Sequence, residues 1–424
     1  MRNKHFQTLL ATLAFLSGCE SANSIGTFND GTVNLPTANL PVREGVTKVV
    51  AGANHTCALF STGTVKCWGH NNLQQLGIGA GADQPVPTQV VGVADAIDLY
   101  AGVDQTCAIL AEGEMCWGNG SAPTLTGQTG VGEIQFGSDY SCIRGLNGFS
   151  SDIETPGSLS CTGGADIDLQ LGDGSVVSAL QVATGNLHTC ALQPDSSVQC
   201  WGDDTFGELG NGAFGGSQAN PFTIQAGAPL ANYPATLIAA GNGFTCAAGF
   251  PNQDVSCWGD NAFDELGTAG ANQNLPVEAS ATPINALAIA TNALAHFVCV
   301  IQLDDTVWCW GDNSLGQLGT GGPAVPAPAG AGPTLGRAHG IAVGQNHACA
   351  IYYGNGTVVP TSSDPVPDPS PSPLPAPSPL PPSTDSEQFG IYCWGDNSDG
   401  QLGIGSIGGP QNTPQLIPTG SLYP

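Results

Sequence analysis

The stretch from residue 57 to residue 69 decides the fold and reads Cys57-Ala58-Leu59-Phe60-Ser61-Thr62-Gly63-Thr64-Val65-Lys66-Cys67-Trp68-Gly69. Its Ser-Thr-Gly segment is typical of a turn between two short strands. In the antiparallel hairpin that results, Cys57 lies opposite Cys67. Directly opposed Cα atoms are about 4.5 to 5.5 Å apart, which is inside or close to disulfide range. The stretch therefore predicts a hairpin closed by its own disulfide.

This unit recurs seven times along the chain. Six copies keep Cys-Trp-Gly, and the third reads Cys161-Thr162-Gly163. The predicted disulfides are Cys57 with Cys67, Cys107 with Cys116, Cys142 with Cys161, Cys190 with Cys200, Cys246 with Cys257, Cys299 with Cys309, and Cys349 with Cys393. The first cysteines of successive units are 35 to 56 residues apart, a period that suits one four-stranded propeller blade.

Two further motifs accompany the cysteines. In six units a glycine stands five residues before the first cysteine, and in most units a Gln-Leu-Gly or Glu-Leu-Gly segment follows Cys-Trp-Gly. The second unit lacks this segment, the third lacks its Trp, and the sixth has Ala293-Leu294-Ala295 in place of the glycine. Local irregularity is expected in these three blades.

The composition disfavours long helices and two classes of binding partner. The chain has 60 Gly and 32 Pro in 424 residues, which leaves few stretches where a long helix can run. Its formal net charge of -27 disfavours binding to nucleic acid or to anionic membrane surfaces.

The order of these motifs resembles the blade signature of the regulator of chromosome condensation repeat family. In the first unit the matching residues are Val49-Ala51-Gly52, Asn54-His55-Thr56, Gly63-Thr64-Val65, Cys67-Trp68-Gly69 and Gln75-Leu76-Gly77. The resemblance covers roughly residues 46–424 and implies an all-β, seven-bladed β-propeller with, from the cysteine spacing, one hairpin disulfide per blade. It also implies protein binding through loops at one face, since related propellers bind a small GTPase and, in a bacterial secreted relative, β-lactamases. Exchange activity on a GTPase is not carried over to an exported chain.

The N-terminus reads as an export signal. Residues 1–18 combine a charged start with a short apolar run, and Leu16-Ser17-Gly18-Cys19 resembles a bacterial lipoprotein cleavage box. Cys19 is then the lipidated first residue of the mature protein, and residues 19–45 form a flexible stalk. The alternative is an ordinary signal peptide with a chance cysteine. The expected location is the bacterial cell envelope outside the cytoplasm, on the outer membrane or cell surface, with membrane contact through the lipid only.

The cysteines and tryptophans each have a rival interpretation. Zinc would need four ligands around one ion, whereas these cysteines come as opposed pairs, and free thiols would need a reducing compartment. The tryptophans are expected to pack between blades, and the alternative of a sugar-binding aromatic ring needs them exposed to solvent. The packing set is Trp68, Trp117, Trp201, Trp258, Trp310 and Trp394.

Histidines and acidic turns provide the other candidate chemistry. His55, His188 and His347 stand two residues before a cysteine, at a position that is Phe244 or Phe297 in other units, so a packing role is expected. The Asp and Asn residues after Cys-Trp-Gly fit Asx turns better than calcium loops, and Asp166-Ile167-Asp168 is the nearest approach to a cation motif. No catalytic residue, metal or cofactor is predicted.

Two predictions concern the last unit. Residues 359–388 are rich in Ser-Pro and Leu-Pro and are expected to form a disordered, Pro-rich insertion within the last blade, serving as a docking arm, a spacer or surface decoration. Residues 413–418 look like a strand that Val46 to Ala51 continues, so the two ends are expected to share one blade and close the ring.

The sequence favours a non-enzymatic, monomeric binding scaffold that presents propeller loops to a protein partner. Two alternatives remain open. One is an extracytoplasmic polysaccharide hydrolase or lyase with paired carboxylates at the channel mouth. The other is an inhibitor of a secreted enzyme, for which a cationic target would be electrostatically favoured.

Overall fold

The computed structural model describes residues 45–146, 157–163, 178–224, 234–249, 253–279, 284–322, 337–353 and 389–422. The predicted signal peptide, Cys19 and the Pro-rich insertion lie outside these residues. No helix within the described ranges has the length and apolar character needed to cross a membrane.

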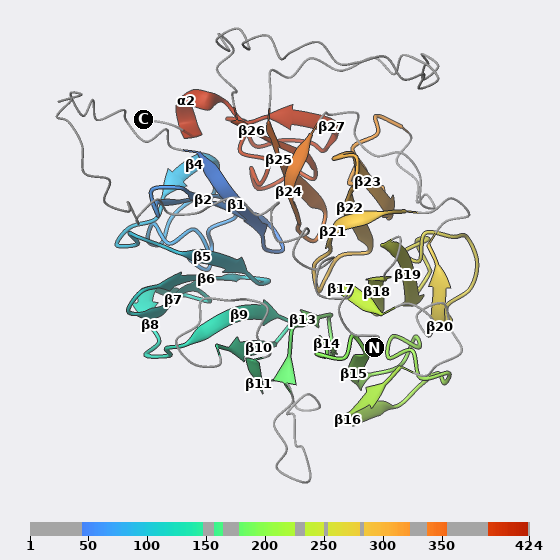
Figure 1. The fold of residues 1–424 in the computed structure, drawn as a ribbon. Helices are drawn as coiled ribbons and strands as arrows, with labels where there is room; N and C mark the ends of the chain where they lie inside the picture. Colours follow the sequence, from blue (N-terminus) through green and yellow to red (C-terminus); the bar gives the residue numbers. More distant parts are fainter. Residues whose placement is uncertain are drawn as a thin grey trace, which may run out of the picture. The chain divides into compact units, whose positions relative to one another are not determined.

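The strands form seven antiparallel sheets around a common axis, one per predicted unit (Figure 1). The first three sheets contain β1 (Val46–Ala51), β2 (His55–Phe60), β3 (Val65–Gly69) and β4 (Gln84–Gln89); β5 (Asp98–Ala101), β6 (Gln105–Leu110), β7 (Gly113–Gly118) and β8 (Ser121–Leu125); and β9 (Val131–Phe136), β10 (Tyr140–Gly145), β11 (Gly157–Gly163) and β12 (Ser178–Ala179). The next two contain β13 (Gln181–Thr184), β14 (His188–Leu192), β15 (Val198–Asp203) and β16 (Ser217–Thr223); and β17 (Ala235–Ala240), β18 (Phe244–Gly249), β19 (Asp254–Gly259) and β20 (Gln273–Glu278). The last two contain β21 (Ala286–Ala290), β22 (Phe297–Gln302) and β23 (Val307–Gly311); and β24 (Ala338–Val343), β25 (His347–Tyr353), β26 (Phe389–Gly395) and β27 (Gln411–Leu416). The chain is thus an all-β, seven-bladed propeller, as predicted.

The central hairpin of every blade has the predicted register. Cys57 pairs with Cys67 across β2 and β3, and the equivalent cysteines face each other in the other six blades. All seven predicted pairs are joined as disulfides, with Cα atoms 4.0 to 4.1 Å apart. The prediction of one hairpin disulfide per blade is confirmed. Such a set of disulfides is typical of an oxidising compartment outside the cytoplasm.

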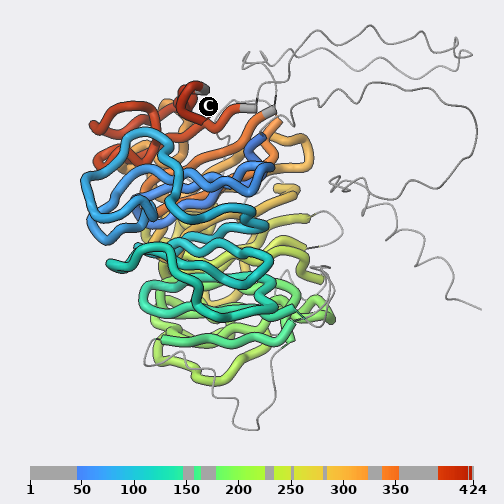
Figure 2. Tube along the Cα trace, turned by 90° about the vertical axis from the view of Figure 1, so that its left-hand side faces the viewer, coloured from blue at the N-terminus to red at the C-terminus, as the bar shows by residue number. Residues whose placement is uncertain are grey.

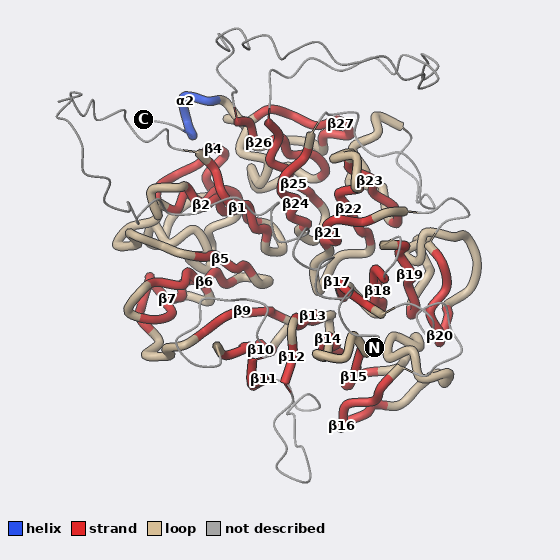
Figure 3. The backbone as a smooth tube through the Cα atoms, viewed as in Figure 1, coloured by secondary structure: helices blue, strands red, loops and turns tan. Residues whose placement is uncertain are grey.

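Strands and loops make up almost all of the described chain, and one short helix, α2 (Thr419–Leu422), follows the last strand (Figure 3). The core lies between the blades, because each sheet buries both faces against its neighbours. All six tryptophans of the packing set are at most 1% exposed. This position excludes the alternative of an exposed aromatic ring.

The ring does not close as predicted. β1 begins the first sheet and β27 ends the seventh, so the chain ends contribute to different blades and each blade is built from contiguous chain. Figure 2 shows the last blade, in red, beside the first, in blue. The prediction of a shared blade was wrong because β26 already pairs with the C-terminal strand β27. The first and seventh blades are joined by contacts between sheets instead. Val46, Phe60 and Trp68 pack with Ile391, Leu402 and Leu422. The Lys66 ammonium donates to the α2 carbonyls of Ser421 and Leu422, and main-chain hydrogen bonds such as Gln345 N–H to the Ala53 carbonyl (3.1 Å) also cross this junction.

Candidate functional site

One end of the propeller carries most of the repeated polar motifs, and we call it the loop face. It consists, in each blade, of the loop between the first two strands and the turn between the last two, residues 52–54 and 70–83 in the first blade. The other end carries the central hairpin turns and the connections between blades, and we call it the hairpin face.

The innermost strands of all seven blades enclose an axial cavity of about 310 Å³. The loop of the sixth blade, where the glycine motif is missing, extends over it, and the Asn292 side-chain amide donates to the carbonyl of Ala51 at 3.3 Å. The alternative of a polysaccharide hydrolase or lyase needs two carboxylates at the channel mouth. The described lining residues include Lys48 and no Asp or Glu.

The glycine before each hairpin leaves room for an aromatic ring. A Cβ added to Gly52 would lie 2.1 Å from Cε1 of His55, and one added to Gly241 would lie 2.3 Å from a ring carbon of Phe244. The imidazole Nε2 atoms of His55, His188 and His347 each form a 2.8 Å hydrogen bond with a threonine hydroxyl of the next blade. These histidines therefore pack between blades and do not form a common site.

Burial controls the charge of these three rings. It lowers the pKa of His55 and of His188 to about 3 and that of His347 to about 4. They are neutral at neutral pH, which agrees with the occurrence of phenylalanine at the equivalent position of two other blades.

A tryptophan latch joins most neighbouring blades. The indole Nε1 of one blade donates to the main-chain carbonyl of the Gln or Glu in the Gln-Leu-Gly segment of the preceding blade. The five described latches are Trp68 to Gln401 (2.9 Å), Trp117 to Gln75 (3.0 Å), Trp258 to Glu208 (2.8 Å), Trp310 to Glu265 (2.8 Å) and Trp394 to Gln317 (2.7 Å). Nε1 of Trp201 has no partner among the described residues, and the segment expected to provide one, which contains Gln170, lies outside them.

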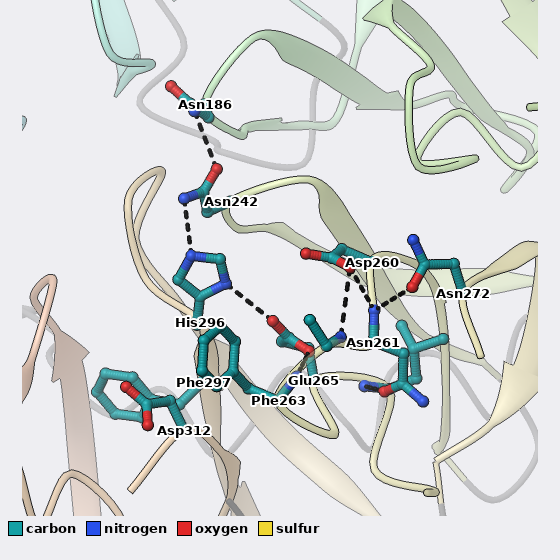
Figure 4. Close-up of polar contacts among 12 residues, drawn as sticks. Asn186, Asn242, Asp260, Asn261, Phe263, Glu265, Asn272, His296, Phe297 and Asp312 are labelled. Atoms are coloured by element: carbon teal, nitrogen blue, oxygen red, sulfur yellow. Dashed lines mark hydrogen bonds and ion pairs between the residues drawn. The ribbon is translucent and has the colours of Figure 1, made fainter. Parts of the chain in front are cut away.

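The side chain of the same Gln or Glu reaches the loop of the next blade. Gln75 Nε2 donates to Asp104 Oδ1 at 2.9 Å, and Nδ1 of His296 lies 2.8 Å from Glu265 Oε1. Figure 4 shows how this second contact continues through Asn242 to Asn186, so one hydrogen-bonded chain crosses the fourth, fifth and sixth blades. Burial lowers the pKa of His296, but the hydrogen bond and charge of Glu265 raise it more, and the net shift is upward.

The acidic turns are mostly Asx turns, as expected. Asp312 Oδ1 accepts from the Ser314 amide at 2.9 Å, and Asp396 Oδ1 accepts from the Ser398 amide at 3.0 Å. Asp166 and Asp168 lie outside the described residues.

The junction between the second and third blades lacks both halves of the latch. The second blade has no Gln-Leu-Gly segment, and Thr162 stands where the third blade would carry its Trp. A pocket of about 220 Å³ lies here, and we call it the 2–3 pocket. It is lined by Asp104, Gln105, Asn119, Phe136, Asp139, Tyr140 and Thr162, among others. The missing Gln-Leu-Gly segment of the second blade and the missing Trp of the third therefore belong to the same junction.

The loop face is acidic. Its loops carry the exposed or half-exposed Asp83, Asp104, Asp139, Asp264 and Asp399, and the buried Asp204, Asp260, Asp312 and Asp396. None of the described Lys or Arg residues lies in its loops. Lys48 pairs with Asp98 at 2.6 Å, and the nearly buried Arg144 pairs with Glu133 at 3.1 Å.

A second group of ionisable side chains lies on the loop face where the ring closes. Nδ1 of His70 is 3.1 Å from Asp83 Oδ1 and 3.5 Å from Asp399 Oδ1. Burial raises the pKa of Asp399, which His70 opposes and the neighbouring Asp83 charge reinforces. Neither this cluster nor the 2–3 pocket was predicted from the sequence.

Comparison with known proteins agrees with the repeat analysis. Two models of the regulator of chromosome condensation (RCC1) repeat match, one at residues 46–75 and 180–208 and the other at residues 62–109 and 390–422. The probable E3 ubiquitin-protein ligase HERC6 of Homo sapiens is 28% identical over 78% of this chain and 29% of that protein. The ultraviolet-B receptor UVR8 of Arabidopsis thaliana is 28% identical over 64% of this chain and 54% of that protein. The chain thus spans about a third and about half of the length of these two relatives.

Among solved structures, Prp20p of Saccharomyces cerevisiae, described with its binding properties to Gsp1p and histones, superposes with a TM-score of 0.58 at 16% identity. The superposition covers 70% of this chain and 80% of Prp20p, and it supports the fold alone. Repeat motifs, family models and blade architecture together show a seven-bladed propeller that contains regulator of chromosome condensation repeats.

Proposed function

We propose that this protein is a non-enzymatic scaffold that binds a basic protein partner through its loop face, outside the cytoplasm. Export through residues 1–18 and a lipid anchor at Cys19 belong to the proposal and agree with the seven disulfides. Protein binding is the activity for which propellers of this repeat type are typically used.

The 2–3 pocket is the observation that carries this proposal. Its mouth holds the exposed Asp139 and the half-exposed Asp104, and Phe136 and Tyr140 contribute aromatic walls. Two carboxylates beside aromatic rings suit a Lys or Arg side chain, which pairs with the charges and stacks on the rings. A pocket that receives one anchoring side chain is a common centre for a protein interface.

The charge of the surrounding face favours the same partner. Asp104 and Asp139 line the pocket, further acidic side chains lie in the loops of other blades, and none of the described Lys or Arg residues lies in these loops, so the field steers a basic surface toward this end. Half-exposed apolar side chains on the same face, Leu73, Phe206 and Phe263 at 37 to 38% exposure, add area that a partner would cover.

The test uses the full, lipidated protein in cells. A photo-crosslinking amino acid replaces Thr162 in the pocket or, as a matched control, Val91, which is 66% exposed on the hairpin face. A protein crosslinked from position 162 and not from position 91 supports the proposal. Crosslinks from position 91 alone, or from neither position, overturn it.

The second measurement is the affinity of the crosslinked partner for a variant in which a larger side chain fills the 2–3 pocket. Thr162→Trp introduces the residue that six other blades carry and should lower the affinity at least tenfold, whereas Val91→Ser should leave it unchanged. Asp139→Asn should lower affinity less and reduce its dependence on salt. Equal binding by Thr162→Trp and wild type would place the partner elsewhere.

A further inference from the structure

The cluster of His70, Asp83 and Asp399 joins the two ends of the ring. His70 follows β3 and Asp83 precedes β4, both in the first blade, whereas Asp399 lies in the turn after β26 of the seventh blade. The three ligand atoms lie within 4.8 Å of one another, and the side chains are 22 to 26% exposed. The cluster is therefore close to solvent but held by the packed junction between first and last blades.

We propose that these three residues bind a divalent transition-metal ion, with Zn²⁺ as the best match, and that this ion clasps the first blade to the seventh. One imidazole nitrogen and two carboxylate oxygens are ligands that Zn²⁺ commonly takes, and water completes an exposed site. Ligand atoms about 2.1 Å from a tetrahedral ion are about 3.4 Å apart. The nitrogen-to-oxygen distances of 3.1 and 3.5 Å in this cluster lie on either side of that value.

The hydrogen bonding of the His70 ring also favours a bound cation. Nδ1 of His70 is inaccessible to solvent and makes no hydrogen bond with any residue that the structure describes, although both carboxylate oxygens lie within ion-pair distance. Each carboxylate already accepts one bond from its own surroundings, Asp83 from the Asn71 amide at 2.8 Å and Asp399 from the Asn54 side chain. A cation between the nitrogen and the two oxygens would bind all three atoms and neutralise the charges of two carboxylates that no described Lys or Arg pairs with.

Comparison among the blades shows that this junction departs from the repeat. Four residues after Cys-Trp-Gly the other complete turns carry an apolar side chain, and only the seventh blade carries a carboxylate. The apolar residues are Leu73, Phe206, Phe263 and Leu315. Directly after Cys-Trp-Gly the turns of the fourth to seventh blades carry Asp, and the first blade carries His70. Both departures face each other at the one junction that no continuous peptide crosses.

The experiment uses the oxidised full chain, treated with a chelator and then titrated with ZnCl2. We expect one Zn²⁺ per chain to remain bound after desalting and the Tm to rise by about 2 to 4 °C at saturating Zn²⁺. Asp399→Leu restores the residue of two other blades and should fold, yet it should lose both the bound ion and the Tm rise.

Two further variants keep the result interpretable. Asp83→Asn mimics Asn272, which occupies the equivalent place in the fifth blade, and should weaken Zn²⁺ binding at least tenfold. Asp264→Asn removes a turn carboxylate outside the cluster and should keep full binding. No stoichiometric Zn²⁺ in the wild type, or equal binding by wild type and Asp399→Leu, would overturn the proposal.

Discussion

Two junctions between neighbouring blades have the same architecture but are filled differently. The junction of the fifth and sixth blades holds a tryptophan latch, and the junction of the second and third blades holds a pocket. At the first, Trp310 is buried and donates to the carbonyl of Glu265 at 2.8 Å, and twelve buried residues form one apolar cluster. At the second, Thr162 is exposed, the segment that would accept the latch is missing, and a pocket of about 220 Å³ remains. A latch holds blades together, and its loss leaves a place where something else can bind.

The largest expected effect is at the latched junction. Trp310→Ala should lower the free energy of unfolding by about 3 to 5 kcal/mol, because it removes a buried indole and leaves a cavity. Thr162→Ala should change it by less than about 0.5 kcal/mol, since this side chain is exposed. Thermal melts under oxidising conditions measure both. Equal losses would show that the two junctions do not differ in stability.

Loss of a disulfide should lower the free energy of unfolding in both the third and the sixth blade. Replacing Cys142 and Cys161 of the third blade by Ser, or Cys299 and Cys309 of the sixth, should cost about 3 kcal/mol in the chain-entropy model. The disulfide of the third blade closes a 19-residue loop, whereas that of the sixth closes a 10-residue loop, so its removal should cost slightly more stability. Melting of each double variant beside the wild type with and without reductant provides the check. A variant that melts like the oxidised wild type would contradict the stabilising role.

The hydrogen bond of the latch can be tested separately from its packing. Trp310→Phe keeps an aromatic ring but leaves the Glu265 carbonyl without its donor, at an expected cost of about 1 to 3 kcal/mol. Trp201→Phe is the matched variant, because Nε1 of Trp201 has no described partner, and it should cost less. If the two variants lose the same stability, Trp201 has an acceptor beyond the described residues.

The smallest expected effect depends on pH. His188 bonds Thr245 at the junction of the fourth and fifth blades, and Phe244 occupies the equivalent place at the next junction. The folded pKa of His188 is about 3, below its usual value of 6.5. Between these values the unfolded chain binds the proton and the folded chain does not, so this residue's contribution is complete above pH 6.5 and decreases as pH falls.

His188→Phe should therefore retain about 1 kcal/mol more stability than the wild type on going from pH 7.5 to pH 5.5. The difference between the two proteins is the measured quantity, because Glu208, whose pKa burial raises to about 7, shifts stability in the opposite direction over part of this range. Parallel pH profiles of the two Tm values would show that His188 does not titrate as described.

The hairpins, the disulfide pairs and the burial of the tryptophans follow from local rules. Alternation along a strand and the ten-residue spacing of Cys57 and Cys67 specify them without knowledge of the rest of the chain. Ring closure does not follow from such rules, because residues 46–51 and 411–416 both read as strands and only the pairing with β26 decides between two sheets. The meeting of His70 with Asp399, more than 300 residues away, depends on that closure and has no local signature.

The 2–3 pocket had a signal that was visible in the sequence. The missing Gln-Leu-Gly segment and the missing Trp belong to consecutive units, in the order in which a latch joins them. Recognising them as two halves of one contact needed the hydrogen bonds of the complete junctions, such as Trp117 to Gln75.

Because each blade is built from one contiguous stretch of chain, the order and number of blades can be changed without dividing a sheet. No sheet combines the first strand of the propeller with its last, so a cut at any connection between blades leaves every sheet intact. Circular permutants that start at different blades should then assemble the same molecule. For the same reason, duplication or deletion of one gene segment adds or removes a whole blade, and the ring can change size without an intermediate that carries half a sheet.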